Sequence, residues 1–404
     1  MAKYELLAPV GNFAMLHSAL EAGADAVYFG LQEFNMRDSA KNFRIRNLNK
    51  IKRICENYPK KPKIYLTLNT IIYDKELRKI EEILKKVKGK IDAVICWDFS
   101  VINLCKKYKI PFHISTQASV SNSDSAKFFK NLGAERIVLA RELNLKQIKK
   151  ISKIIPVECF IHGAMCVSVS GRCFASQFVH NLSANRGKCA HPCRREWKIT
   201  DDTGNELKLS NNRVMSAKDL CTLPFIEKMK KAGIKSFKIE GRNRSPEYVS
   251  KIVSVYRKAL DKKLSTEEIS KSIKELKKVY NRGLSPGFYI RPPTSEDFSS
   301  SENGEQTESK VFIGKIEKYW PKSEAASVRI FNNGLKIGKE VYIISKNAPI
   351  KRTKIESIEF EGEKINGAKK GESVGISLPK CFKGDEIYLI KKSLHLPQNY
   401  YPYQ

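Results

Sequence analysis

The feature that most constrains the fold is a regular alternation of short apolar runs with helical patterns through the N-terminal 60% of the chain. The eight runs lie at 4–9, 26–31, 63–69, 92–97, 111–116, 136–141, 157–162 and 236–241. Most are nearly continuous in aliphatic and aromatic residues, which is typical of parallel strands buried on both faces. The pattern predicts an α/β fold, a (β/α)8 barrel of the TIM type. A doubly wound open sheet is the alternative, because a sequence does not show closure.

One connection is much longer than the others. Residues 163–235 separate the seventh and eighth predicted strands, and such an insertion lies at the mouth of a barrel, where active sites form. We therefore assign 1–292 to the barrel with this insertion. Residues 293–310 are polar and rich in Ser and Glu, which predicts a linker. The apolar period then changes to about two, so 311–391 predict a small β-barrel, followed by a tail at 392–404.

Charge and apolar content indicate the compartment and the partner. The chain has 74 Lys and Arg against 43 Asp and Glu, a formal net charge of +31. This excess favours a polyanionic partner, with RNA or DNA first, although Lys enrichment across a genome gives the same composition. No long apolar run predicts a membrane span or an export signal, so we expect a cytoplasmic protein that does not bind a membrane.

Four of the ten cysteines cluster within the insertion. Cys166, Cys173, Cys189 and Cys193 have the spacing Cys-x6-Cys-x15-Cys-x3-Cys. Four thiolates can hold an iron–sulfur cluster or one Zn²⁺, and the paired CxxC knuckles typical of zinc ribbons are missing from this spacing. Spacing favours iron–sulfur but leaves zinc, or no metal, open. A cytoplasmic chain has no need of a disulfide framework.

Polar residues follow several predicted strands and would meet at the barrel mouth. We expect a ligand with carboxylate or phosphate groups there, because arginines bind both in bidentate fashion. The predicted substrate-binding residues are Arg37, Asn69, Gln117, Arg141 and Arg242, and the predicted catalytic residues are His162, Glu240 and Asp98. The alternative is that Arg141–Glu142 and Glu240–Arg242 are structural ion pairs.

The residues around the cysteines resemble a known family. ECFIHGAMCVSVSGRCFAS (158–176) matches the signature of the U32 "collagenase-like peptidase" family, and GKCAHPCRREW (187–197) and SFKIEGRNRS (236–245) continue the match. The resemblance covers nearly the whole barrel. The segment 311–391 is similar to the family's C-terminal domain, which resembles the second domain of translation elongation factors and suggests a role in docking tRNA.

Within this family the chain is most similar to proteins that make 5-hydroxyuridine at the wobble position of tRNA. The resemblance implies prephenate, a small dicarboxylate, as co-substrate, and an iron–sulfur cluster of the 4Fe–4S type on the four cysteines. Other members hydroxylate an rRNA cytidine or a quinone precursor, the last as a pair, so a homo- or hetero-oligomer with a paralogue is a further expectation. The peptidase label is the alternative function. The sequence contains no GxSxG, HExxH, P-loop or GxGxxG motif.

Overall fold

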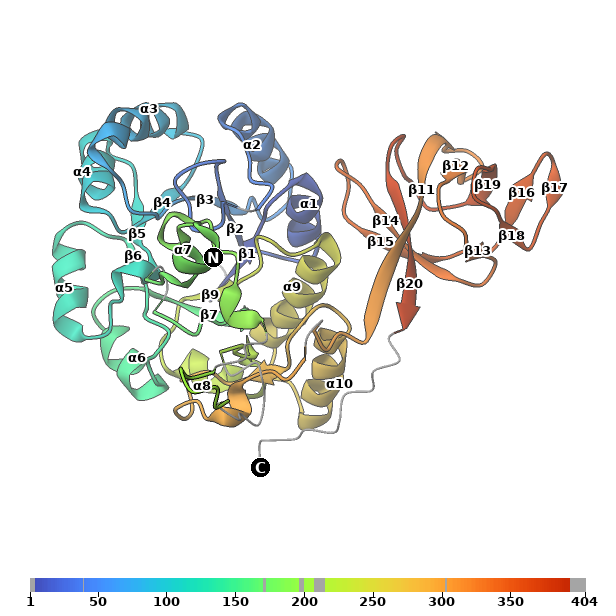
Figure 1. Cartoon of the computed structure of the whole chain (residues 1–404). Helices are drawn as coiled ribbons and strands as arrows, with labels where there is room; N and C mark the ends of the chain where they lie inside the picture. Colours follow the sequence, from blue (N-terminus) through green and yellow to red (C-terminus); the bar gives the residue numbers. More distant parts are fainter. Residues whose placement is uncertain are drawn as a thin grey trace.

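The structure, a computed structural model, describes residues 4–38, 40–169, 172–195, 200–206, 215–301 and 304–392. Two parts with separate apolar cores are visible (Figure 1), a ring of strands and helices and a C-terminal sheet beside it. The predicted tail lies outside the described residues except for Lys392.

Eight parallel strands form the inner ring. They are β1 (Glu5–Pro9), β2 (Ala26–Gly30), β3 (Lys63–Leu68), β4 (Ala93–Cys96), β5 (Phe112–Ile114), β6 (Arg136–Val138), β7 (Val157–Gly163) and β9 (Ser236–Ile239). Each of β1 to β7 pairs with the next, and β9 pairs with both β7 and β1. The ring is therefore closed, which confirms the predicted barrel and rules out the doubly wound sheet.

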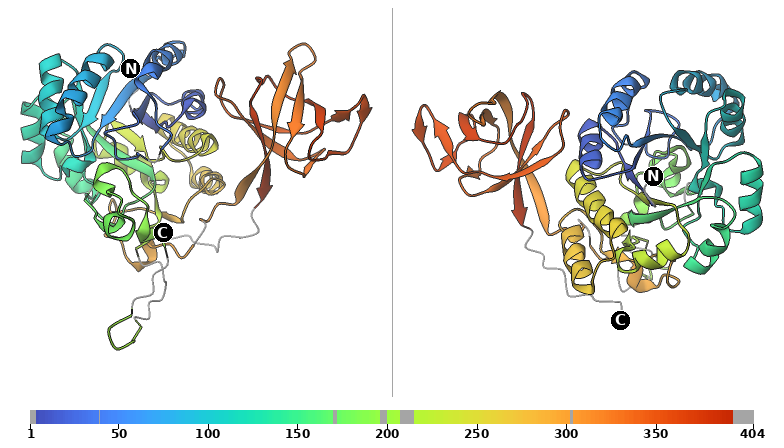
Figure 2. Two further views of the ribbon diagram at one scale, coloured as in Figure 1. Left: turned by 45° about the horizontal axis from the view of Figure 1, so that its top comes forward. Right: turned by 180° about the vertical axis from the view of Figure 1, so that it is seen from behind.

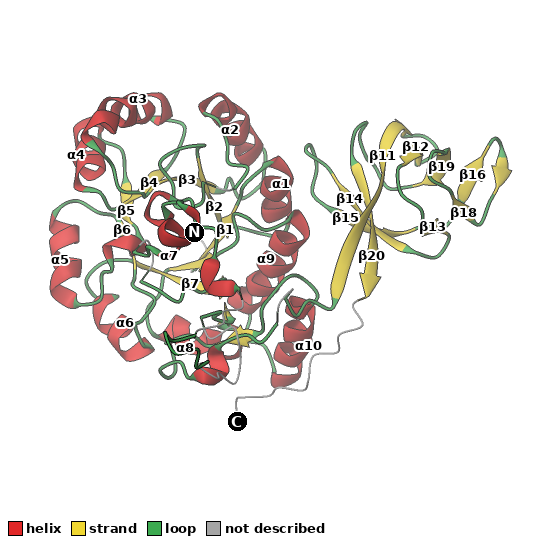
Figure 3. Cartoon of the chain, viewed as in Figure 1, coloured by secondary structure: helices red, strands yellow, loops and turns green. Residues whose placement is uncertain are grey.

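Helices surround the barrel (Figure 3). They are α1 (Phe13–Glu21), α2 (Leu48–Glu56), α3 (Leu77–Val87), α4 (Phe99–Tyr108), α5 (Ser123–Asn131), α6 (Leu145–Ile151), α8 (Ile226–Lys231), α9 (Pro246–Asp261) and α10 (Thr266–Lys277). Local sequence explains where several begin, because Asn12, Asn122 and Asn144 cap α1, α5 and α6 by accepting backbone hydrogen bonds. In α3 the residues Ile80, Leu84 and Val87 share one buried face, as their spacing predicts.

The predicted insertion contains more than one kind of structure. It carries the short helix α7 (Ala175–His180), the single turns Ala184–Arg186 and Pro192–Arg194, the strand β8 (Asp219–Cys221), and α8. We call residues 163–169 and 172–195 the roof segment, because Figure 1 shows α7 over the middle of the ring. The sequence did not predict β8, which pairs antiparallel to β7 and parallel to β10 (Leu284–Ser285).

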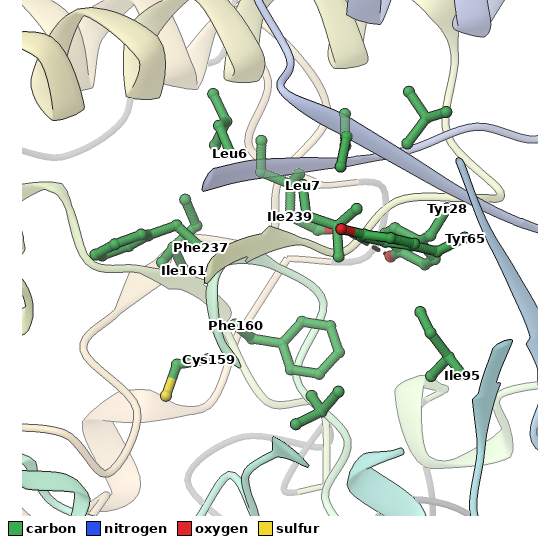
Figure 4. Packing of buried hydrophobic residues seen from close by; sticks show 14 of the residues in the cluster. Leu6, Leu7, Tyr28, Tyr65, Ile95, Cys159, Phe160, Ile161, Phe237 and Ile239 are labelled. Carbon is green, nitrogen blue, oxygen red and sulfur yellow. Dashed lines mark hydrogen bonds between the residues drawn. The ribbon is translucent and has the colours of Figure 1, made fainter. Parts of the chain in front are cut away.

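Side chains alternate along the barrel strands between the interior and the helix layer. Along β7 the Phe160 ring and the Cys159 side chain point in opposite directions (Figure 4). Toward the N-terminal end of the strands, the barrel interior is occupied by an ion network in which Glu158 accepts from Arg136 at 3.1 Å and Lys238 at 2.7 Å. Burying these charges is tolerated because each has a hydrogen-bonded partner of opposite sign.

The C-terminal part is an antiparallel sheet with its own core. Its strands include β11 (Glu308–Trp320), β12 (Ala325–Ile330), β14 (Glu340–Ile344), β15 (Lys351–Lys354), β16 (Ile358–Phe360), β17 (Glu363–Lys364), β19 (Ser373–Ser377) and β20 (Glu386–Lys392). They run in the order β15-β14-β20-β11-β12-β19-β16-β17, and β13 (Leu335–Lys336) pairs separately with β18 (Gly367–Ala368). Lys310 contacts Glu247 of α9 at 2.7 Å, and Figure 2 shows the sheet on that side of the barrel.

The region predicted as a linker is partly built into the barrel. Asp297 is buried, and its carboxylate accepts hydrogen bonds from Ser285 Oγ at 2.6 Å and Arg291 Nη1 at 2.7 Å. Ser299 is also fully buried and its amide donates to the carbonyl of Ser216. A fragment intended to fold as the barrel alone therefore needs residues up to at least Ser299.

Among the described helices, none is both long enough and apolar enough to cross a bilayer.

Candidate active site at the barrel mouth

A cavity of about 190 Å³ lies between the C-terminal ends of the barrel strands and the roof segment. Its wall includes ten of the predicted site residues: Arg37, Asn69, Gln117, Arg141, Cys166, Cys173, Cys189, Cys193, Glu240 and Arg242. Strand ends contribute the polar residues, and the roof segment contributes the cysteines. The two predicted residues that do not line it are His162 and Asp98.

The four thiols of the roof segment gather on one side of this cavity. Burial raises the pKa of Cys193 to about 11, an effect that Arg194 opposes and that the charges of Cys166, Cys189 and Cys173 reinforce. Ser176 Oγ lies 3.8 Å from the Cys189 sulfur, within reach of a weak hydrogen bond. As placed, no three His, Cys, Asp or Glu side chains of the described residues form a group that could hold a metal ion. Four thiols are nevertheless the donor set by which proteins bind iron–sulfur clusters, so the residue types present fit such a group.

Arg186 and Gly187 make two of the contacts that fix the roof segment to the barrel. The Arg186 guanidinium pairs with both carboxylate oxygens of Glu76 and lies over the Tyr73 ring, 4.5 Å from its centroid. Gly187 has a φ of +89°, and its carbonyl accepts from the Asp38 amide at 3.2 Å. A Cβ at Gly187 would lie 2.2 Å from the Asn35 carbonyl oxygen. Only glycine fits both the conformation and the space at this position.

Gly187→Ala is expected to displace the loop that carries Cys189, because the new methyl group cannot coexist with the Asn35 backbone. We expect a loss of about 2–3 kcal/mol in unfolding free energy, from left-handed strain plus overpacking. Iron content should fall with it. Thermal unfolding and iron analysis of the purified protein measure both effects.

Gly89→Ala is the matched control for this change. Gly89 has a φ of +74°, and a Cβ added there would have no neighbouring atom within 4 Å. The control therefore carries the conformational strain without the clash. Equal iron content and equal stability for the two variants would contradict a role for Gly187 in positioning the roof segment.

Three arginines project into the cavity from different strand ends. Arg141 donates through Nη1 to the Ala164 carbonyl at 2.9 Å and lies over the Phe160 ring at 3.9 Å. Arg242 donates through Nη1 to Asn35 Oδ1 at 2.9 Å and to Thr67 Oγ1 at 3.0 Å. The Nε atoms of both arginines are buried and have no hydrogen-bond partner within the described chain. All three arginines line the cavity, and guanidinium groups in a cavity wall suit a ligand with anionic oxygens.

Glu240 is the counter-ion of these arginines. Its Oε1 lies 3.1 Å from Arg37 Nε. Burial alone would raise the pKa of Glu240, but the charges of Arg37, Arg141 and Arg242 outweigh burial and lower the pKa to about 2. The carboxylate is therefore ionised at neutral pH and is a weak base, so orienting the arginines suits it better than proton transfer.

Asn69 and Gln117 form a hydrogen-bonded pair in the cavity wall. Asn69 Nδ2 donates to Gln117 Oε1 at 3.2 Å and to Ser115 Oγ at 3.3 Å, while Asn69 Oδ1 accepts from the Met36 amide. Ser115 Oγ also donates to Gln117 Oε1. The network holds amide groups in fixed orientations along the wall, as recognition of a planar polar ligand requires.

His162 was predicted to be catalytic, but it faces away from the cavity. In the pairing of β7 with β9, Cys159 lies opposite Phe237, Phe160 opposite Lys238, and His162 opposite Ile239, so one residue of β7 is skipped. This β-bulge turns the His162 ring toward Tyr248 and Tyr256 of α9. Burial lowers the pKa of His162 to about 3, assisted by Arg244, so the ring is a neutral packing residue.

Asp98 was also predicted to be catalytic, but it is a helix cap. Its Oδ1 accepts hydrogen bonds from the amide and hydroxyl of Ser100 at the start of α4, and its Oδ2 accepts from the Ile72 amide at 3.2 Å. Both oxygens are used in structure. A polar residue directly after a strand is ambiguous in sequence, since caps and catalytic groups occupy the same position.

The structure adds charged residues that sequence reasoning missed. Lys238 lines the cavity floor beneath Glu240, and strand periodicity could have indicated this, because residues two apart share a face. Asp219 of β8 is fully buried and lies 3.6 Å from Arg244 and 3.8 Å from Arg282, two arginines that also line the cavity. Burial raises the pKa of Asp219, and Arg244 and Arg194 oppose this. Asp219 could not be identified from the sequence, because β8 has only three residues and so short a strand shows no clear alternation of apolar and polar positions.

Comparison with known proteins gives the family context of this site. The sequence profile of peptidase family U32 matches residues 11–299. A protein named collagenase from Porphyromonas gingivalis is 37% identical over 410 residues, covering 96% of this chain and 98% of that protein. The tRNA hydroxylation protein P1 of Bacillus subtilis is 34% identical over 382 residues, covering 91% and 90%. A 23S rRNA 5-hydroxycytidine synthase of Escherichia coli is 37% identical over 262 residues, covering 64% of this chain and 39% of that protein.

Proposed function

This chain belongs to peptidase family U32, and we propose that it is an RNA hydroxylase acting on the wobble uridine of tRNA, with prephenate as co-substrate and an iron–sulfur cluster as cofactor. The observation that carries the proposal is the meeting of four thiols and three arginines in the wall of one cavity. Relatives named for tRNA hydroxylation and for rRNA hydroxycytidine synthesis support the reaction class.

The arginines supply the site for the dicarboxylate. Arg141 and Arg242 line the cavity, and Arg37 completes a local excess of positive charge over Glu240. Two carboxylates can pair with two guanidinium groups in a cavity where few waters compete. Glu240 keeps the arginines oriented, and the Asn69–Gln117 pair recognises the remaining polar groups.

The cysteines supply the site for the cofactor. Cys166, Cys173, Cys189 and Cys193 would hold a 4Fe–4S cluster at the cavity wall, where it would supply electron-transfer or Lewis-acid chemistry. Ser176 and backbone amides of the roof segment would donate hydrogen bonds to sulfur, and such bonds tune reduction potential. Arg37 and Arg141 lie close enough for Cys166 to influence the pKa of both, so the dicarboxylate site and the thiols are adjacent.

The RNA is held by positive charge outside the cavity. The net charge of +31 and the excess of Lys and Arg over acids in residues 311–391 suit contacts with phosphates, which supply affinity without sequence specificity. We assign the C-terminal sheet to RNA docking and the barrel to chemistry. The target base enters the cavity unstacked, as enzymes that modify bases require.

Deleting the gene tests the proposal. We expect 5-hydroxyuridine and its derivatives to disappear from tRNA nucleosides measured by mass spectrometry, and to return with the wild-type gene but not with a Cys189→Ala gene. Digests of 23S rRNA from the same strains report 5-hydroxycytidine. Unchanged tRNA nucleosides in a strain that lacks any paralogue would overturn the tRNA assignment, and loss of the rRNA nucleoside would redirect the proposal to rRNA.

Peptidase activity is the second candidate, favoured by the relative named collagenase. Purified wild-type protein and the Cys166→Ala and Cys189→Ala variants are incubated with gelatin. Degradation by the wild type that each substitution abolishes would support a peptidase. We expect no cysteine-dependent degradation, because a cysteine peptidase needs an imidazolium beside its thiolate. Burial lowers the pKa of His191, the histidine of the cavity wall, to about 4, so its imidazole is uncharged at neutral pH.

A further inference from the structure

The outer surface of the roof segment is unusually apolar. Six of the 14 large apolar side chains that are exposed in the described chain fall between residues 167 and 182. They are Val167, Val169, Phe174, Phe178, Val179 and Leu182, which we call the roof patch. Phe178 is 85% exposed and Phe174 is 63% exposed. Concentrated exposure of this kind marks an interaction site, since scattered single residues are the normal case.

The roof patch is continuous with the cavity rim. In α7, Ala175 and Ser176 line the cavity, while Phe178 is exposed, as is Phe174 directly before the helix. Val167 belongs to both, since it is 41% exposed and also lines the cavity. A polymer with one unit in the cavity must therefore pass over or beside α7 with its neighbouring units.

The charge around the roof patch indicates what kind of polymer fits. Residues 163–195 contain five cations, Arg172, Arg186, Lys188, Arg194 and Arg195, and no Asp or Glu. Arg186 is paired with Glu76, but Arg172, Lys188 and Arg195 are exposed. Exposed aromatic rings among exposed cations form a surface that binds single-stranded nucleic acid, with bases on the rings and phosphates on the cations.

We propose that Phe174 and Phe178 form a stacking platform for unpaired RNA bases next to the nucleotide that enters the cavity. The two ring centroids are 6.3 Å apart with an interplanar angle of 51°, so the rings are tilted and not stacked on each other, and both are mostly exposed. This inference rests on RNA being the substrate, as proposed above. It goes further by naming the residues that hold the flanking nucleotides and by requiring these nucleotides to be unpaired, as in a loop.

Affinity at several salt concentrations tests the platform in the full-length iron-loaded protein. The probe is a synthetic anticodon stem-loop RNA with 2-aminopurine beside the wobble uridine. Phe178→Ala is expected to weaken binding about tenfold with an unchanged salt slope, because stacking releases no counterions. Arg172→Gln is expected to reduce the salt slope by about one. Quenching of 2-aminopurine should occur with the wild type and be lost in the Phe174→Ala, Phe178→Ala double variant.

Phe128→Ala is the matched control, because Phe128 is 54% exposed on α5 outside the roof segment. Its RNA affinity should equal that of the wild type. Equal affinity and equal quenching for Phe178→Ala would overturn the platform. If Phe178→Ala abolishes self-association in sedimentation and leaves RNA affinity unchanged, the roof patch binds a second copy of the chain and not RNA. RNA binding with the expected quenching but no hydroxylated product would keep the platform and reject the proposed reaction.

Discussion

Replacing Cys189 with alanine is expected to remove protein-bound iron and to abolish RNA hydroxylation. Cys189 is one of four thiols in the cavity wall, and its sulfur is the one that Ser176 Oγ approaches. Loss of one thiolate leaves a cluster with an incomplete ligand set, and the cluster chemistry depends on all four positions. Iron and sulfide analysis after anaerobic purification, the visible absorption spectrum, and tRNA nucleoside analysis measure the effect.

Cys381→Ala serves as the control for this substitution. Cys381 is buried in the core of the C-terminal sheet, so the change removes a thiol without touching the barrel mouth. The control should retain iron, colour and activity. Full iron content in the Cys189→Ala protein would refute the ligand assignment. If the anaerobically purified wild type contains zinc and no iron, the four cysteines form a structural zinc site and not an iron–sulfur site.

The barrel could be predicted because its signal is repeated eight times. Each strand is a short apolar run with a helix after it, and errors in one element do not change the overall pattern. Closure could not be predicted, because it depends on β9 pairing with both β7 and β1 across a separation of more than 200 residues in the second case. No local pattern encodes such a pairing.

The position of a side chain at the barrel mouth could be predicted where it follows regular strand geometry, and could not where the backbone departs from it. Arg141, Glu240 and Arg242 follow strand ends and reach the cavity, as expected. His162 does not line the cavity, because one β-bulge reverses its direction, and a bulge carries no reliable sequence signal. Asp98 does not line the cavity either, because its carboxylate caps helix α4.

The position of the cysteines depends on contacts that only the structure shows. Motif spacing marks the four residues, but their approach to the arginines follows from the Arg186–Glu76 pair and from the close contact of Gly187 with Asn35. Asn35 also accepts from Arg242 and from the Arg37 amide. One asparagine thereby couples the roof segment to two of the three arginines of the proposed dicarboxylate site.

Arg242→Gln is expected to weaken prephenate binding about 30-fold or more while leaving iron content unchanged. Arg242 is 4% exposed and lines the cavity, so its buried guanidinium places a positive charge in the cavity wall. Removing one member of a buried charged pair costs a few kcal/mol, which corresponds to this loss. Calorimetric titration of prephenate into the iron-loaded protein measures it directly.

Arg242→Lys separates charge from geometry in the same site. Lysine keeps the positive charge but cannot donate from two fixed nitrogens, so it should recover only part of the affinity.

Burial lowers the pKa of Arg242 to about 10, with Tyr28 and Glu240 opposing burial, so the guanidinium is charged at neutral pH. Prephenate binding to the wild type should therefore be constant near neutral pH and weaken as the pH rises through 10, where the arginine loses its proton. Arg329→Gln, an exposed change in the C-terminal sheet, should leave prephenate binding intact. Wild-type affinity in the Arg242→Gln protein would show that the dicarboxylate does not bind at the arginines of the barrel mouth.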